Sequence, residues 1–182
     1  MKLLAAWCFA GSLSMAGPAQ AHSASDAYLT LEARAAEPAV VQGLWDIALR
    51  DLDFVLGLDD DGNGAITWGE LRRHQAEIAR YALAHLTLTA DGKTCAIGVT
   101  RQWVDGHADG SYAALFFEAR CPAKPVRLTL DYRLFFDIDP SHRAIVVAHA
   151  GADTATAVLA PDHARIDLAV APRAASTAAS AR

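Results

Sequence analysis

The stretch LTLTADGKTCAIGVTR, residues 86–101, decides which fold class the chain is expected to adopt. Apolar and polar residues alternate on both sides of the dipeptide Asp91-Gly92. A half-buried strand alternates with a period of two, and Asp-Gly between two alternating runs is a strong signal for a two-residue hairpin turn. The stretch therefore predicts two antiparallel strands, over residues 86–90 and 93–101.

The same pattern of short alternating runs and turns continues in both directions from this hairpin. Before it, residues 28–33 and 41–49 alternate and are separated by a break at Glu37-Pro38, which favours an antiparallel pair. After it, further strand candidates cover residues 112–121, 126–138, 144–148, 156–159 and 166–170. Many short strands with compact turns predict a mainly β protein, an antiparallel β-sandwich-like domain.

One segment replaces this pattern with a helical period. Apolar residues recur every three or four positions between Trp68 and Ala84, which predicts the only long helix of the chain. A short helical turn is expected over residues 52–56. The helical region, at about 50–85, is therefore expected as an insertion between the second and third strands. Trp45, Trp68 and Trp103 are expected to fill the core, because aromatic side chains supply bulk.

The segment between the two helical stretches, DDDGNGAITWGE at residues 59–70, is rich in oxygen donors. Calcium is a hard cation that takes about seven oxygen ligands at roughly 2.3–2.6 Å. Gly64 stands at the sixth position of the segment, where such a loop needs a positive φ for a sharp turn. The sequence predicts a Ca²⁺ site whose ligands are Asp59, Asp61, Asn63, the carbonyl of Ala65, Thr67 directly or through water, and bidentate Glu70.

This segment resembles the calcium loop of the EF-hand family over its full length, and the resemblance implies non-catalytic Ca²⁺ binding. Gly57 weakens the incoming helix, Asp51 replaces a usually apolar residue, and the sequence offers no second loop to pair with Ile66. A single loop favours a structural clamp, which presents a surface to a partner, over a sensor that opens a groove. The alternative is an Asp- and Gly-rich surface turn that caps a helix. Asp60, between two ligands, is expected to face solvent.

The beginning of the chain predicts export. Met1-Lys2, a short apolar run and Ala19-Gln20-Ala21 form the pattern of a secretory signal peptide over residues 1–21, with a retained membrane anchor as the alternative. The apolar run is shorter than the roughly 20 residues of a transmembrane helix, and no span is predicted in the mature chain. We expect a periplasmic or secreted protein, with a β-rich domain over residues 22–172 and a disordered Ala/Ser-rich tail over 173–182.

Cysteine usage agrees with an oxidising compartment. Cys8 would leave with the signal peptide, so Cys95 and Cys121 are the two thiols of the mature chain. An even pair in an exported protein predicts a disulfide, and two buried free cysteines are the alternative.

The composition excludes two classes of protein. The chain of 182 residues is 53% hydrophobic and 20% charged, which excludes a disordered polyelectrolyte. Its formal net charge is −5, and an acidic surface repels phosphates, so no nucleic-acid partner is expected.

A second resemblance covers residues 25–170. The runs SDAYLTL (25–31), WDIALRDLD (45–53) and DYRLFFDIDPSHR (131–143) are similar to the exported N-terminal region of HupE/UreJ-type membrane proteins. The resemblance implies an accessory role, with a membrane protein or another exported protein as partner. It also supports an alternative function, a periplasmic accessory or carrier protein for nickel or copper. It carries no transport role, because the helical membrane portion of that family lies outside the matching region.

Two histidine-containing groups offer weaker metal sites. His22 would become the N-terminal residue after cleavage and could bind copper through its amine and ring, against an ordinary mobile terminus. Asp137, Asp139 and His142 surround Pro140 and could hold a metal, but Asp-Pro-Ser is typical of a turn.

An enzymatic reading is the least favoured. Ser111, Asp109 and His107 lie close in sequence, but a catalytic triad needs convergence in space and an oxyanion hole. A hydrolase with an unrecognised site is the remaining alternative, and no enzymatic activity is expected.

Overall fold

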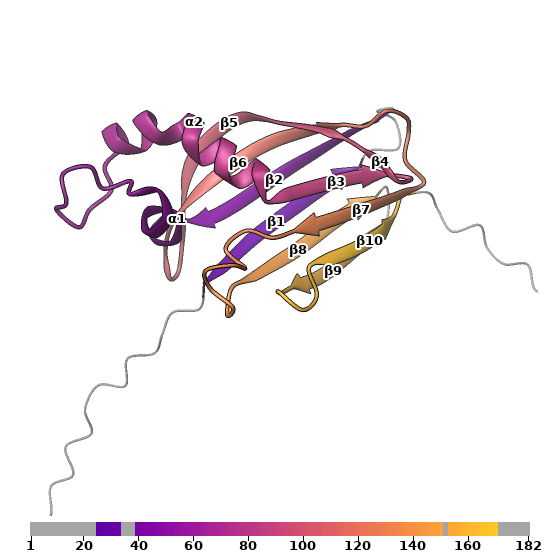
Figure 1. The fold of residues 1–182 in the computed structure, drawn as a ribbon. Coiled ribbons are helices and arrows are strands. Elements are labelled where there is room, and N and C mark those ends of the chain that lie inside the picture. Colours follow the sequence, from indigo (N-terminus) through magenta and orange to yellow (C-terminus); the bar gives the residue numbers. More distant parts are fainter. Residues whose placement is uncertain (1–24, 34–38, 151–152, 171–182) are drawn as a thin grey trace, which may run out of the picture.

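The computed structural model describes residues 25–33, 39–150 and 153–170, which form two β-sheets and two helices (Figure 1). The elements are β1 (Asp26–Ala33), β2 (Val40–Ala48), α1 (Leu49–Leu56), α2 (Trp68–Ala84), β3 (Leu86–Ala90), β4 (Lys93–Thr94), β5 (Ala96–His107), β6 (Gly110–Arg120), β7 (Arg127–Tyr132), β8 (Arg143–Ala150), β9 (Asp153–Leu159) and β10 (Arg165–Ala169). The mainly β class is confirmed. The predicted signal peptide (1–21), His22 and the predicted tail (173–182) lie outside the described residues.

The larger sheet has six strands in the order β5-β6-β2-β1-β8-β9. β1 and β2 form the predicted antiparallel pair, with Leu29 opposite Trp45. On its other side, β1 pairs in parallel with β8, with Leu29 opposite Val146. The expected antiparallel pairing therefore holds for the other strand pairs of the described residues and is wrong for β1 and β8. A parallel pair needs a long crossover, and the whole chain between β1 and β8 provides one.

The smaller sheet has four strands in the order β10-β7-β3-β4 and contains the predicted hairpin. Ala90 pairs with Lys93, and the two turn residues, Asp91 and Gly92, have φ of 48° and 80°. Positive φ at both positions is what a tight hairpin turn requires. The predicted single strand over residues 93–101 is wrong, because the chain leaves this sheet after Thr94 and β5 joins the larger sheet.

The cysteine pair lies where the chain passes from the smaller sheet to the larger one. Cys95 lies between β4 and β5, and its sulfur is 2.04 Å from that of Cys121, which follows β6. Both residues are buried. The predicted pair is thus at disulfide distance, and it fixes the crossover between the two sheets.

The core lies between the sheets and draws on both. Leu29 and Trp45 come from the larger sheet, and Leu88 and Leu130 from the smaller one. Trp45 is buried in the core, as expected. The same expectation is wrong for Trp68, which is 46% exposed, and for Trp103, which is 60% exposed. These two rings pack edge to face on each other, 5.5 Å apart. Trp68 is at the exposed start of α2, and Trp103 alternates along edge strand β5 with Val104, which packs against the core.

The predicted strand over residues 126–138 ends early. β7 stops at Tyr132, and a series of turns follows. Leu134 and Phe135 remain buried there, and Phe135 has φ of 61°. The sequence pattern continued past the strand because these turn residues also enter the core.

The two helices lie between β2 and β3, and α2 has the predicted bounds. α1 starts three residues before the predicted helical turn, at Leu49, and ends at Leu56. Gly57 caps it, because its left-handed conformation (φ 64°) lets its N–H donate to the carbonyl of Asp53. Both helices pack on the core, through Leu52 and Ile78 among others. Within the described residues, neither helix is long and apolar enough to cross a membrane.

Candidate metal centre

The predicted calcium loop connects α1 to α2 and is anchored at both ends. Leu58 precedes the loop and is fully buried, and Leu71 follows it and is 4% exposed. Between them the chain runs over the surface, with most residues exposed. The core therefore fixes where the loop begins and ends.

Three carboxylates of the loop converge. Asp59, Asp61 and Glu70 each offer an oxygen, and these oxygens lie within 4.8 Å of one another. Two oxygens that bind one calcium ion at about 2.3–2.6 Å can be at most about 5 Å apart. The first, third and twelfth positions of the segment thus meet the distance requirement of one hard cation.

The other three predicted ligands take part in hydrogen bonds that shape the loop. The amide oxygen of Asn63 accepts from the backbone N–H of Ala65 over 2.8 Å, and the hydroxyl of Thr67 donates to Glu70 over 2.7 Å. The predicted ligand of Ala65 is its backbone carbonyl, so the hydrogen bond from the Ala65 N–H to Asn63 does not compete with ion binding. These contacts keep the three residues on the same turn of chain as the carboxylates.

Backbone amides point into the loop toward the first carboxylate. Oδ2 of Asp59 accepts from Gly64 N–H over 2.7 Å, and its Oδ1 accepts from Asn63 N–H over 3.2 Å. Gly64 has φ of 82°, as predicted for the sixth position. The Gly64 bond, with smaller help from Asn63, holds the pKa of the Asp59 carboxyl below its usual value. The loop therefore keeps this carboxylate ionised.

Glu70 is the one carboxylate of the three that is buried, at 3% exposed. Its Oε2 accepts from the hydroxyl and the N–H of Thr67, and its Oε1 accepts from Asp60 N–H over 3.1 Å. The hydroxyl bond, followed by the backbone bond, lowers the pKa of Glu70. Glu70 also completes a capping box with Thr67 at the start of α2.

Asp60 is exposed, as expected, and its side chain also binds the first turns of α2. Its carboxylate accepts from Arg73 Nε over 2.9 Å and lies 2.9 Å from His74 Nε2. The His74 bond and then Arg73 lower the pKa of Asp60, and the same contact raises the pKa of His74. Asp60 thus ties the loop to the helix without joining the carboxylate cluster.

Ile66, which has no partner loop in the sequence, finds its neighbours in the β domain. It is half-buried and packs against the core. It also lines a cavity of about 450 Å³ between the loop and the β5–β6 turn. Asp59 and Trp68 border this cavity from one side, and Val104 and Tyr112 from the other.

Two other candidate groups, the turn at Asp137–His142 and the cluster around Ser111, lie within the described residues, and neither assembles there as the metal site or catalytic triad considered from the sequence. Asp139 Oδ1 accepts from the N–H and the hydroxyl of Ser141, as expected if this segment is a turn. The side chain of His107 pairs with Asp46, and that of Asp109 accepts from the hydroxyl of Tyr112. Neither side chain therefore takes the role toward Ser111 that a catalytic triad requires. The described residues therefore bring together no triad at this turn.

His142 is buried in a hydrogen-bonded chain that the sequence did not indicate. The hydroxyl of Ser25 donates to Asp51 over 2.8 Å, so Nδ1 of His142 donates to Ser25 over 2.7 Å. Nε2 of His142 then accepts from the hydroxyl of Tyr132 over 2.8 Å. Burial lowers the pKa of His142 to about 4. The ring is a neutral structural element, joined to α1 through Ser25 and Asp51.

Comparisons with known proteins give no further identification. No protein-family model matches the chain, and no curated protein matches it significantly. The function must therefore be argued from the geometry of the loop and its surroundings.

Proposed function

We propose that residues 59–70 bind one calcium ion and that this ion acts as a structural clamp between α1 and α2 in an exported, non-catalytic, β-sandwich-like domain. The observation that carries the proposal is the convergence of Asp59, Asp61 and Glu70 within 4.8 Å. Together with Asn63, Ala65 and Thr67, these residues would form an EF-hand-type loop inserted into the β domain.

The choice of calcium rests on the donor set. All six predicted ligands offer oxygen, the donor that calcium prefers. Glu70 can bind through both carboxylate oxygens, which fills a seventh position that octahedral magnesium resists. A divalent cation would also relieve the repulsion among three neighbouring carboxylates.

The role of a clamp rests on the anchoring of the loop. Leu58 and Leu71 hold its ends in the core, and Ile66 packs from its middle. An ion bound by both the first and the last residues of such a loop would join the end of α1 to the start of α2. Ligand binding to the folded state stabilises that state, by about 2.7 kcal/mol when the free ion is at 100 times its dissociation constant.

Export and a protein partner belong to the same proposal. The Cys95–Cys121 pair is typical of oxidising compartments such as the periplasm or the cell exterior. Trp68 belongs to the loop segment and its exposed ring packs on the exposed ring of Trp103, so the clamp would hold both rings in a fixed position for a membrane protein or another exported protein.

The test compares melting with about 1 mM calcium and with a chelator for the wild type, Asp61→Asn and Asp60→Asn. Each variant removes one negative charge, and the two substituted residues are neighbours in the sequence. Only Asp61 belongs to the carboxylate cluster. Calcium is expected to raise the melting temperature of the wild type and Asp60→Asn by about 5–10 °C, and that of Asp61→Asn far less.

The comparison uses the calcium-induced shift, because Asp60→Asn also loses its contacts with Arg73 and His74 and starts from a lower melting temperature. An equal shift in both variants would refute the assigned ligands. No shift in the wild type would refute the clamp.

A further inference from the structure

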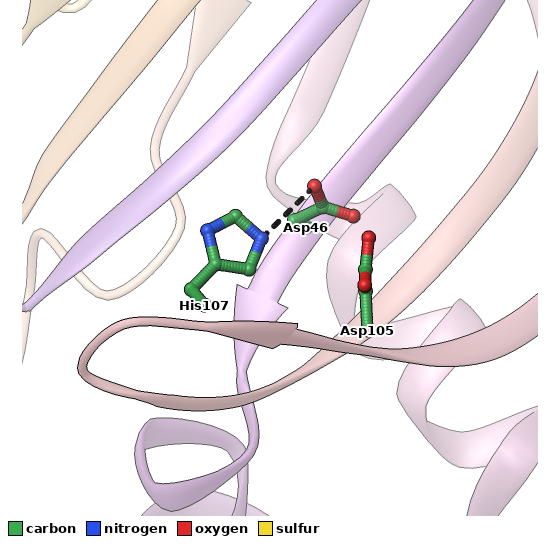
Figure 2. Close-up of side chains that lie close together, drawn as sticks. All are labelled: Asp46, Asp105 and His107. Carbon is green, nitrogen blue, oxygen red and sulfur yellow. Dashed lines mark ion pairs between the residues drawn. The ribbon is translucent and has the colours of Figure 1, made fainter.

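A second group of metal-ligating side chains lies on the outer face of the six-stranded sheet. Asp46 is on β2, and Asp105 and His107 are on β5, two residues apart. β6 separates the two strands, with Ala114 opposite both Asp46 and Trp103. Residues two apart on a strand share a face, so all three side chains lie opposite the core-facing Trp45. One ligand atom from each lies within 4.8 Å of the others (Figure 2).

Asp46 is the unusual member of this group. The residue is 8% exposed, yet its Oδ1 is buried without a hydrogen-bond partner among the described residues. Its Oδ2 lies 3.4 Å from Nε2 of His107, and Figure 2 shows Oδ1 on the side of Asp105. A buried acceptor without a partner destabilises the fold, and a neighbouring carboxylate adds repulsion. Burial and then Asp105 raise the pKa of Asp46, although His107 opposes the shift.

His107 is held in place for this group by two aromatic rings. Its ring stacks on Tyr28, with centroids 4.8 Å apart, and packs at a tilt against Tyr112, with centroids 4.1 Å apart. The hydroxyl of Tyr112 donates to Asp109 over 2.8 Å, which fixes the tyrosine in turn. Nε2 of His107 is therefore directed at Asp46 by packing and does not depend on the ion pair alone.

We propose that Asp46, Asp105 and His107 form a second metal site, for a divalent ion of borderline softness such as Zn²⁺. One imidazole nitrogen and two carboxylate oxygens are donors that zinc accepts at about 2.0–2.2 Å, so two donors of a tetrahedral ion lie about 3.4 Å apart. The distance between His107 Nε2 and Asp46 Oδ2 already has this value, at 3.4 Å. The ion would give Oδ1 of Asp46 its missing partner and neutralise the two carboxylates.

The site is distinct from the calcium loop in its donor chemistry. An imidazole disfavours calcium, which takes oxygen ligands, whereas the loop offers oxygen alone. Three protein ligands leave one tetrahedral position for water or for a group from a partner. This proposal stands on its own residues and does not depend on calcium binding.

The test is calorimetric titration of the chelator-treated protein with zinc chloride, in about 1 mM calcium to fill the other site. The variants are His107→Gln and Asp105→Asn, both on the edge strand, with His163→Gln, an exposed histidine, as the matched control. Zinc is expected to bind with one-to-one stoichiometry, and both site variants should weaken it by at least about tenfold. His163→Gln and Glu70→Gln should bind as the wild type does.

Cobalt provides a second readout. Tetrahedral Co²⁺ absorbs strongly in the visible range, and these bands should appear in the wild type and be lost in His107→Gln. Circular dichroism of each variant establishes that it is folded. Absence of zinc binding, or zinc binding of equal strength in the wild type and both site variants, would overturn the proposal.

Discussion

The hydroxyl and the backbone N–H of Thr67 both donate to Oε2 of Glu70, each over 2.7 Å. In return, Glu70 N–H donates to the Thr67 hydroxyl over 3.3 Å. The same carboxylate therefore caps α2 and occupies the last position of the proposed calcium loop. Capping and ion binding stabilise the same place in the fold, and separate variants are needed to tell them apart.

Replacing Thr67 with alanine tests the cap. Thr67→Ala removes the side chain that accepts from Glu70 N–H and is expected to lower the free energy of unfolding by about 1 kcal/mol. Urea unfolding in the presence of a chelator measures this loss without a contribution from calcium. Thr67→Ser keeps the hydroxyl and should restore most of the stability. Equal stability of the alanine variant and the wild type would show that the cap is not needed.

Removing the cysteine pair tests the link between the sheets. The two residues are 26 apart in sequence. In the chain-entropy description, closing such a loop stabilises the protein by about 3–4 kcal/mol. The double variant Cys95→Ser/Cys121→Ser should lose about this much in urea unfolding, and the wild type under reducing conditions should behave in the same way. A reduced wild type as stable as the oxidised one would contradict the prediction.

The buried histidine predicts a dependence of stability on pH. The pKa of His142 is about 4 in the folded protein and about 6.5 in an unfolded chain, so the unfolded state binds the proton first. Its contribution is present above pH 6.5 and is lost as the pH falls toward 4, at up to about 1.4 kcal/mol per pH unit.

Unfolding measured at pH 7, 6, 5 and 4 checks this dependence. His142→Gln removes the titrating ring and should give a shallower slope over the same range. A slope unchanged in this variant would assign the acid sensitivity to other groups.

Two glycines in strands, Gly43 and Gly98, differ in the space around them and together test the packing of the larger sheet. A Cβ at Gly43 would collide with the buried ring of Phe117 on the neighbouring strand, whereas a Cβ at Gly98 would meet nothing within 4 Å. Overpacking of this kind costs about 1–3 kcal/mol. Gly43→Ala should lower the melting temperature clearly, and Gly98→Ala should leave it within a degree or two of the wild type or raise it. Similar effects of both substitutions would contradict the described packing.

The features that could be predicted are those with local causes. The Asp91-Gly92 hairpin, helix α2 and the approach of Asp59, Asp61 and Glu70 to one another each follow from a pattern within a short stretch of chain. The carboxylates at the first, third and twelfth positions come together because one tight turn and one helix start bring them there.

The features that could not be predicted depend on contacts between distant segments. Nothing in the alternation of β1 or β8 indicates that they pair in parallel, and nothing in residues 93–101 shows that β5 changes sheets at Cys95. The alternation of β2 indicates only that Asp46 lies on the opposite face from Trp45. Its approach to His107 depends on how β6 separates β2 from β5. Trp103 carries the bulk of a core residue but lies on the outward face of an edge strand.

The most direct test of the central claim is calorimetric titration of the chelator-treated protein with calcium, for the wild type and Glu70→Gln. Glutamine can still accept from Thr67, so the cap is retained while the charge and the bidentate carboxylate are lost. We predict one calcium ion bound per wild-type chain and at least about tenfold weaker binding in Glu70→Gln. A wild-type protein that binds no calcium, or a variant that binds it as tightly, would contradict the account.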